Sequence, residues 1–115
     1  MDNLIEIQEE IVREAMLVAV PGWRSIDINC EVFDFHGDTI TSINFFCNFF
    51  IKKRVQVTNS TDLNFCLRKL SEKMSKKPNE KFSWAIADLK ILRNGKYTFE
   101  FSYDPPPRIT KMLQV

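Results

Sequence analysis

Apolar side chains recur along this chain with two different periods, and each period predicts its own kind of element. Residues 2–19 carry apolar positions at helical spacing and acidic side chains on the opposite side, which predicts an amphipathic helix. Asp2 or Asn3 can cap the start of this helix, and Pro21-Gly22 ends it. Its apolar face comprises Leu4, Ile7, Ile11, Ala15 and Val18.

Between Arg24 and Phe35 the period changes to two, which predicts a strand with one buried face. The alternation breaks at Phe33, which we interpret as a β-bulge. His36-Gly37-Asp38 predicts a turn, and a second strand begins at Thr39. The inward positions of the first strand are Ile26, Ile28, Cys30 and Val32, and its outward positions are Asp27, Asn29 and Glu31.

The segment from Thr39 to Val57 has two interpretations. One is a single long strand that is covered on both faces. The other, which we favour, is a reversal near Cys47-Asn48 followed by a third strand that runs to about Val57. The aromatic run at 45–50 then belongs mainly to the core. Ile43, Phe45, Cys47, Phe49 and Ile51 share one phase of the alternating pattern, whereas Phe46 and Phe50 fall in the other.

A second helix follows the third strand. Asn59-Ser60-Thr61-Asp62 is a capping cluster, because Ser60 or Thr61 can accept hydrogen bonds from the first free backbone N–H groups. Lys77-Pro78-Asn79 closes the helix. Its apolar positions at helical spacing are Leu63, Cys66, Leu67, Leu70 and Met74.

A hairpin closes the fold. Two alternating runs, Phe82–Leu92 and Tyr97–Asp104, flank Asn94-Gly95, a dipeptide that tolerates the positive φ of tight turns. Pro105-Pro106-Pro107 cannot donate ladder hydrogen bonds and ends the last strand, and residues 108–115 predict a short helical turn or a frayed end. In the second run Tyr97, Phe99, Phe101 and Tyr103 share one face, and Thr98, Glu100, Ser102 and Asp104 share the other.

Together these elements predict a single α+β domain over residues 1–115. Its core is a four- to five-stranded antiparallel sheet, with one helix at the N-terminus and a second helix before the C-terminal hairpin. With 115 residues, one domain is the expectation.

Cysteine usage and the N-terminal segment bear on where the protein acts. Three cysteines without CxxC spacing indicate neither a disulfide framework nor a zinc site, so we expect Cys30, Cys47 and Cys66 to be buried, reduced thiols. A basic segment followed by a signal-type apolar core is lacking near the N-terminus. The apolar run Ala15–Pro21 is far too short to cross a bilayer. We therefore expect a cytoplasmic protein that does not enter a membrane.

Charge is distributed unevenly along the chain, although the net charge is +1. Residues 1–38 hold nine acidic side chains against two basic ones, and residues 39–115 hold fourteen basic against six acidic. A basic set concentrated around the second helix could neutralise phosphates, so the alternative function is a small nucleic-acid-binding module. An acidic protein partner is a further possibility for this set. Its members are Lys52, Lys53, Arg54, Arg68, Lys69, Lys73, Lys76, Lys77 and Lys81.

Catalytic chemistry has little support in these residues. His36 is the single histidine, and Asp34 and Asp38 beside it are ordinary residues of a hairpin turn. Only three glycines are present, and neither a nucleophile elbow nor a glycine-rich phosphate loop occurs. We therefore expect no enzyme, no metal and no cofactor, with a hydrolase centred on His36 as the third alternative.

Specific residues within this order of elements resemble a known family. Pro21-Gly22-Trp23 followed by Cys30-Glu31-Val32 resembles the start of YezG-like bacterial antitoxin and immunity proteins. The resemblance covers residues 5–104, and the chain differs in a shorter segment at 47–60 and in Pro105–Pro107, which stand in place of a longer helical ending. The residues that look like the family's closing hairpin are Trp84, Leu89-Lys90-Ile91-Leu92, Asn94-Gly95-Lys96-Tyr97 and Phe101-Ser102-Tyr103-Asp104.

The resemblance implies an immunity protein that binds and blocks a cognate toxin domain, often a nuclease. Nuclease toxins need cationic surface to hold nucleic acid, so a carboxylate-rich inhibitor can occupy that surface with fast, salt-sensitive association. The toxin-binding residues that we hypothesise are Asp27, Glu31, Asp34, His36 and Asp38 around the first hairpin, together with Glu100 and Asp104.

Overall fold

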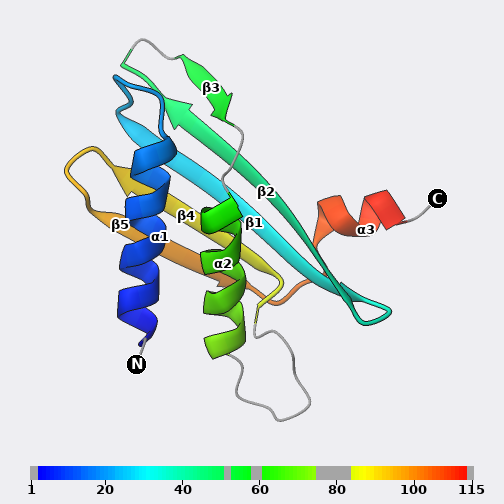
Figure 1. The fold of residues 1–115 in the computed structure, drawn as a ribbon. Coiled ribbons are helices and arrows are strands. Elements are labelled where there is room, and N and C mark those ends of the chain that lie inside the picture. The colour runs from blue at the N-terminus through cyan, green and yellow to red at the C-terminus, as the bar shows by residue number, and fades with distance from the viewer. Residues whose placement is uncertain (1–2, 51–52, 58–60, 75–83, 114–115) are drawn as a thin grey trace.

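The computed structural model describes residues 3–50, 53–57, 61–74 and 84–113, apart from the side chains of residues 34, 35 and 39. Within these residues it contains a five-stranded antiparallel sheet with helices on both of its faces (Figure 1). The order β3-β2-β1-β4-β5 places β1 at the centre and β3 and β5 at the edges. The strands are β1 Ser25–Phe35, β2 Asp38–Asn48, β3 Arg54–Val57, β4 Ile86–Leu92 and β5 Tyr97–Ser102, and the helices are α1 Leu4–Val18, α2 Thr61–Met74 and α3 Pro107–Leu113. This architecture confirms the predicted α+β class.

The register between β1 and β2 is continuous, so the predicted β-bulge at Phe33 is wrong. Every residue pairs in turn, from Ser25 opposite Asn48 to Phe35 opposite Asp38. Phe33 lies two positions beyond Glu31, on the face of the hairpin that packs against α3. Phe33 is therefore an outward-phase apolar residue at a point where α3 covers the second face of the strand. The pairing contains no inserted residue at this position.

The β1–β2 hairpin extends beyond the rest of the sheet (Figure 1). β4 pairs with β1 only over Ser25–Glu31, so the distal part of the hairpin is a two-stranded ribbon. At its tip His36 has φ 51° and Gly37 has φ 86°. Two consecutive residues with positive φ form the type I′ loop that matches the twist of antiparallel strands, which confirms the predicted turn.

The chain reverses after Asn48, as we favoured from the sequence. Phe49 N–H donates to the carbonyl of Lys53 at 2.8 Å, and β3 then pairs with β2 from Arg54 to Val57. The aromatic run divides between the two faces and the reversal. Phe45 is fully buried, whereas Phe50 in the reversal is 78% exposed.

α1 and α2 lie side by side across one face of the sheet and enclose the core between helices and strands (Figure 1). Asn3 caps α1, because its Oδ1 accepts a hydrogen bond from Glu6 N–H at 2.8 Å. α2 begins at Thr61, and the predicted capping residues 59–60 and the closing segment 77–79 lie outside the described residues. The helical side of the core contains Ile7, Ile11, Val12, Ala15, Leu63, Cys66, Leu67 and Leu70, and the strand side contains Ile26, Ile28, Cys30, Val32, Phe45, Cys47, Ala87, Leu89 and Ile91.

The predicted C-terminal hairpin is confirmed over the residues that the structure describes. Gly95 N–H donates to Leu92 O at 2.9 Å, and Leu92 N–H donates to Lys96 O at 2.8 Å. Gly95 has φ 91°, which L side chains rarely adopt. Trp84, just before β4, is fully buried against the ring of Phe101 at a centroid distance of 5.6 Å.

The three cysteines are free and buried, which confirms the expected burial. Burial raises the pKa of Cys30 to about 12. Burial, followed by the hydrogen bond from Cys66 Sγ to Glu10 Oε1, raises the pKa of Cys66 to about 11. Because the unfolded thiols ionise near the ordinary value of 9.0, the unfolded chain loses these protons first as the pH rises.

We predict that the native protein reacts slowly with a thiol reagent at pH 8 and that all three cysteines react rapidly in denaturant. These thiols should not affect the free energy of unfolding below about pH 9, and that free energy should fall as the pH rises from about 9 toward 11. Absorbance during thiol labelling and urea unfolding at several pH values measure the two effects. Rapid labelling of the native protein would contradict the burial described.

The division of the aromatic run predicts unequal effects of two matched substitutions. Phe45→Ala should lower the free energy of unfolding by about 3–5 kcal/mol, because it removes a fully buried ring and leaves a cavity. Phe50→Ala should cost less than about 1 kcal/mol, because this ring is largely exposed. Its cation–π contact is with the guanidinium of Arg24, whose Cζ lies 4.9 Å from the ring centroid. Urea unfolding of both variants measures the difference, and equal losses would contradict the assigned register.

Candidate functional site

The face of the sheet that points away from α1 and α2 is polar. Its side chains line a hollow of about 550 Å³, and Pro107 and Arg108 at the start of α3 bound it. We call this surface the polar sheet face. It contains Asp27 and Asn29 from β1, Asn44 and Phe46 from β2, Arg54 from β3, Asp88 and Lys90 from β4, and Thr98 and Glu100 from β5.

Asp27 lies on this face and is held by neighbours from β2 and β3. Its Oδ2 accepts a hydrogen bond from Asn48 Nδ2 at 2.8 Å and lies 3.2 Å from Arg54 Nη1. The Arg54 guanidinium also lies over the ring of Phe46, 4.2 Å from its centroid. Because half-exposed ion pairs contribute at most about 1 kcal/mol, Asp27 can exchange Arg54 for a cation of a partner at small cost.

Asp88 and Glu100 stand directly opposite each other in the β4–β5 ladder. Both are exposed, and Asp88 Oδ1 accepts a hydrogen bond from Asn29 Nδ2 at 2.6 Å. Among the described residues neither carboxylate forms a salt bridge. Like charges at directly opposed positions destabilise an antiparallel pair. The edge of the polar sheet face therefore carries a negative charge that an external cation can neutralise.

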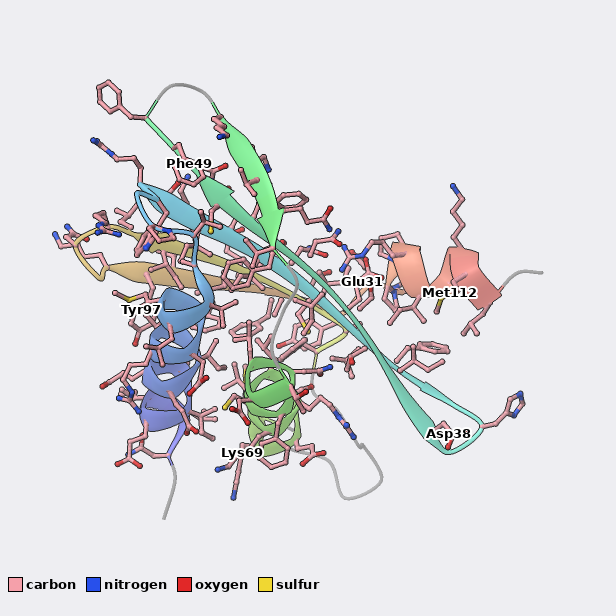
Figure 2. All side chains as sticks on the ribbon, turned by 45° about the horizontal axis from the view of Figure 1, so that its top comes forward. Glu31, Asp38, Phe49, Lys69, Tyr97 and Met112 are labelled. Carbon is pink, nitrogen blue, oxygen red and sulfur yellow. The ribbon has the colours of Figure 1, made fainter. Side chains whose placement is uncertain are left out.

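Glu31 points to the predicted outward face but is only 1% exposed there, because α3 covers it. Its Oε1 accepts the backbone N–H of Ile109 at 3.0 Å, and its Oε2 lies 3.1 Å from Arg108 Nη1. Figure 2 shows Glu31 at the junction of the hairpin with α3. In this conformation the carboxylate anchors α3 and does not offer a surface to a partner.

Arg108 completes this junction. Its guanidinium donates to the side chain and the carbonyl of Asn29, and to Ser42 O at 2.8 Å and Ser42 Oγ at 3.1 Å. Arg108 therefore satisfies acceptors on both β1 and β2 while it neutralises Glu31. The result is a polar junction that fixes α3 against the central hairpin.

The other hypothesised site residues do not join the polar sheet face. His36 and Asp38 are exposed at the tip of the hairpin, and Figure 2 shows Asp38 far from Glu31. Asp104 follows β5, where its Oδ2 accepts a hydrogen bond from Ser102 Oγ at 3.3 Å. Asp34 pairs with Thr39 in the ladder, and its side chain lies outside what the structure describes. The structure thus brings Asp27, Glu31 and Glu100 of the hypothesised set to one face, with Glu31 buried under α3.

The described members of the basic set are divided between the two faces of the sheet. Arg54 belongs to the polar sheet face. Arg68, Lys69 and Lys73 belong to α2, which covers the opposite face, and Figure 2 shows Lys69 there. Lys53 lies just before β3, with its Nζ 5.8 Å from the centroid of the Phe49 ring. Lys52, Lys76, Lys77 and Lys81 lie outside the described residues.

No group of three or more His, Cys, Asp or Glu side chains among the described residues is placed to hold a metal ion. None of the helices described combines the length and the apolar composition that a membrane span requires.

Two residues of the site escaped the sequence analysis for identifiable reasons. Asp88 shares the alternating phase of Lys90, opposite to that of Ala87, Leu89 and Ile91, and this phase signals an outward-facing position. Arg108 follows Pro107, a residue that favours the first position of a helix and so could have indicated that α3 begins there. Which face α3 would cover is not encoded locally, because Arg108 and Glu31 are far apart in the sequence.

No protein-family model matches this chain, and no match was found among curated proteins. The resemblance to YezG-like antitoxin and immunity proteins therefore stays a prediction from the quoted residues.

We predict that Arg108→Met lowers the free energy of unfolding by about 3 kcal/mol, because it leaves the Glu31 carboxylate buried without its cation. Adding Glu31→Gln to Arg108→Met should recover more than about 1 kcal/mol, since the neutral amide still accepts the Ile109 N–H. Lys111→Met, an exposed change in the same helix, is the control. Urea unfolding measures all three variants, and equal losses for Arg108→Met and Lys111→Met would contradict the junction.

Proposed function

We propose that this protein binds a cognate bacterial toxin domain in the cytoplasm and neutralises it by stoichiometric occlusion, with the polar sheet face as the contact surface. The observation that carries the location is the opposed pair Asp88 and Glu100. Two like charges on one exposed rung cost folding stability. A partner cation that binds between them offsets that cost, so their placement favours a binding role.

The remainder of the polar sheet face suits a protein partner better than a small ligand. The face is broad and contains both signs of charge, with Asp27 beside Arg54 and Lys90 opposite Asp27 across the β1–β4 pair. Mixed charges favour a partner whose own charges are complementary and disfavour others. A nuclease toxin that holds nucleic acid with lysines and arginines matches the acidic positions, and charge attraction accelerates its association at low salt.

Occlusion needs one inhibitor for each toxin and no chemical step. A hydrolase centred on His36 finds no support in the fold, because His36 lies at the exposed tip of the hairpin, away from the polar sheet face. Nucleic-acid binding through the basic set finds less support than toxin binding, because its described members are divided between the two faces. Both remain outcomes of the test below.

The test co-expresses the protein with the product of the adjacent reading frame and measures growth and complex formation. We expect growth to be rescued and a one-to-one complex to be purified. The double variant Asp88→Asn/Glu100→Gln should slow association about tenfold at low salt, because it removes both charges that steer a cationic toxin. The matched control Glu9→Gln/Glu72→Gln removes the same charge from exposed positions on α1 and α2 and should associate like the wild type.

Three results would contradict the proposal. Growth rescue at far fewer than one copy per toxin molecule would indicate catalysis. Equal association of both double variants would remove the polar sheet face as the contact surface. Tight binding of a labelled RNA or DNA, lost in Lys69→Gln/Lys73→Gln, would favour the nucleic-acid module instead.

A further inference from the structure

The outer edge of β5 presents unpaired backbone groups. Leu92 N–H donates to Lys96 O, and hydrogen bonding alternates along an antiparallel pair. The backbone groups of Thr98, Glu100 and Ser102 therefore point toward β4. Those of Tyr97, Phe99 and Phe101 point away from the sheet, where no described strand pairs with them. These three residues offer three donors and three acceptors to an additional strand.

This edge lacks the features that usually prevent strands from pairing. The six residues Tyr97–Ser102 contain no proline, lysine or arginine, and their register with β4 has no bulge. Exposed edges of this kind are templates for an added strand. The opposite edge of the sheet, β3, has only four residues and begins with Arg54. Of the two edges, β5 is therefore the one prepared to accept a partner.

The helix side of this edge is apolar. The rings of Phe99 and Phe101 stack with their centroids 5.8 Å apart, and Tyr97 meets Phe99 edge-on at 5.8 Å. Cys66 of α2 contacts Glu10 of α1, so α2 lies on one flank of α1. Helical spacing places Ile5 and Met16 on the opposite flank of α1. Both side chains are exposed. Apolar residues of an added strand would extend this surface.

The other side of the same edge is acidic. Glu100 is the charged residue of β5 and lies on the polar sheet face, with Asp88 opposite it one strand further in. An added strand would place a side chain beside Glu100, at the spacing of a cross-strand pair. A lysine or arginine at that position would pair with Glu100 directly and weaken the repulsion between Glu100 and Asp88.

We propose that β5 docks an extended segment of the toxin as a sixth strand, in which apolar residues on the helix side alternate with lysine or arginine on the acidic side. This proposal rests on the proposed function and names the mode of contact. A second copy of this chain fits the edge less well. Antiparallel pairing of Phe99 with its counterpart would set the two Glu100 carboxylates diagonally against each other.

The test uses the whole protein and a synthetic strand, the capped peptide acetyl-Lys-Val-Lys-Val-Lys-Val-Lys-amide. We expect the peptide to bind and to slow amide hydrogen exchange at Phe99 and Phe101 at least about tenfold, while Thr98 and Glu100, already bonded to β4, change little. Glu100→Lys should weaken the peptide about tenfold and yet stabilise the free protein, because it pairs with Asp88. Glu72→Lys on α2 is the control with the same charge change.

Each other outcome overturns the strand-addition proposal. These outcomes are absence of binding, protection at other amides, equal binding by Glu100→Lys and Glu72→Lys, and equal binding of a peptide with glutamate in place of lysine. Protection of Phe99 and Phe101 that appears without peptide and rises with protein concentration would identify a second copy as the occupant. If Glu100→Lys rescues growth as efficiently as the wild type, the toxin-binding function is retained but β5 is not its contact site. If the peptide docks as expected but the wild type does not rescue growth, the toxin is not the partner and β5 remains a strand-binding site.

Discussion

A side-chain period of two, kept without interruption along the β1–β2 ladder, is the constraint on which the rest of the structure depends. β1 pairs on both sides, so its phase fixes the phases of β2 and β4 and, through them, of β3 and β5. A slip of one residue would place Asp27 in the core and Ile28 on the surface. Because every strand keeps the same alternation, one face of the sheet is apolar throughout, and α1 and α2 bury their apolar faces against it. The polar sheet face is the other consequence of that alternation.

Much of the fold could be predicted because its signals are local. The helical spacing of α1, the Asn94-Gly95 turn and the alternation of β5 each lie within a few neighbouring residues. The His36-Gly37 turn belongs to the same class, since both positive φ values fall on residue types that tolerate them. The choice between one and two strands after Thr39 was harder. Phe50 is apolar, so the sequence alone favours its burial, and only the reversal explains its exposure.

The candidate site was less predictable, because it depends on contacts between distant residues. Asp27 and Glu100 were identified by charge and phase, and the sheet brings both to one face. Glu31 has the same charge and the same outward phase as Asp27, yet α3 buries it. Phe33 was misinterpreted for the same reason. Both errors have one cause, since nothing near these residues in the sequence shows that a helix will cover the second face of β1 at its distal end.

The two faces of the sheet provide different properties. The helix-covered face supplies the apolar burial that stabilises the domain, at about 25 cal/mol for each Å² removed from water. The polar sheet face contributes little to that burial and can therefore carry opposed charges such as Asp88 and Glu100. β5 borders both environments, with aromatic rings on one side and a carboxylate on the other. The opposed carboxylates of the polar sheet face, which form no described salt bridge, thus lie beside the β5 edge, whose outward backbone groups pair with no described strand.

The contact between Glu31 and Ile109 joins residues 78 positions apart. During synthesis on the ribosome, β1 and β2 are complete long before α3 is made, so the nascent hairpin can form while this carboxylate is still hydrated. Only the arrival of α3 removes the carboxylate from water and closes the end of the hairpin. Assembly therefore finishes at the ribbon, and contacts of such long sequence separation form slowly. Until α3 docks, even a chain whose five strands have paired leaves the second face of this ribbon open to water.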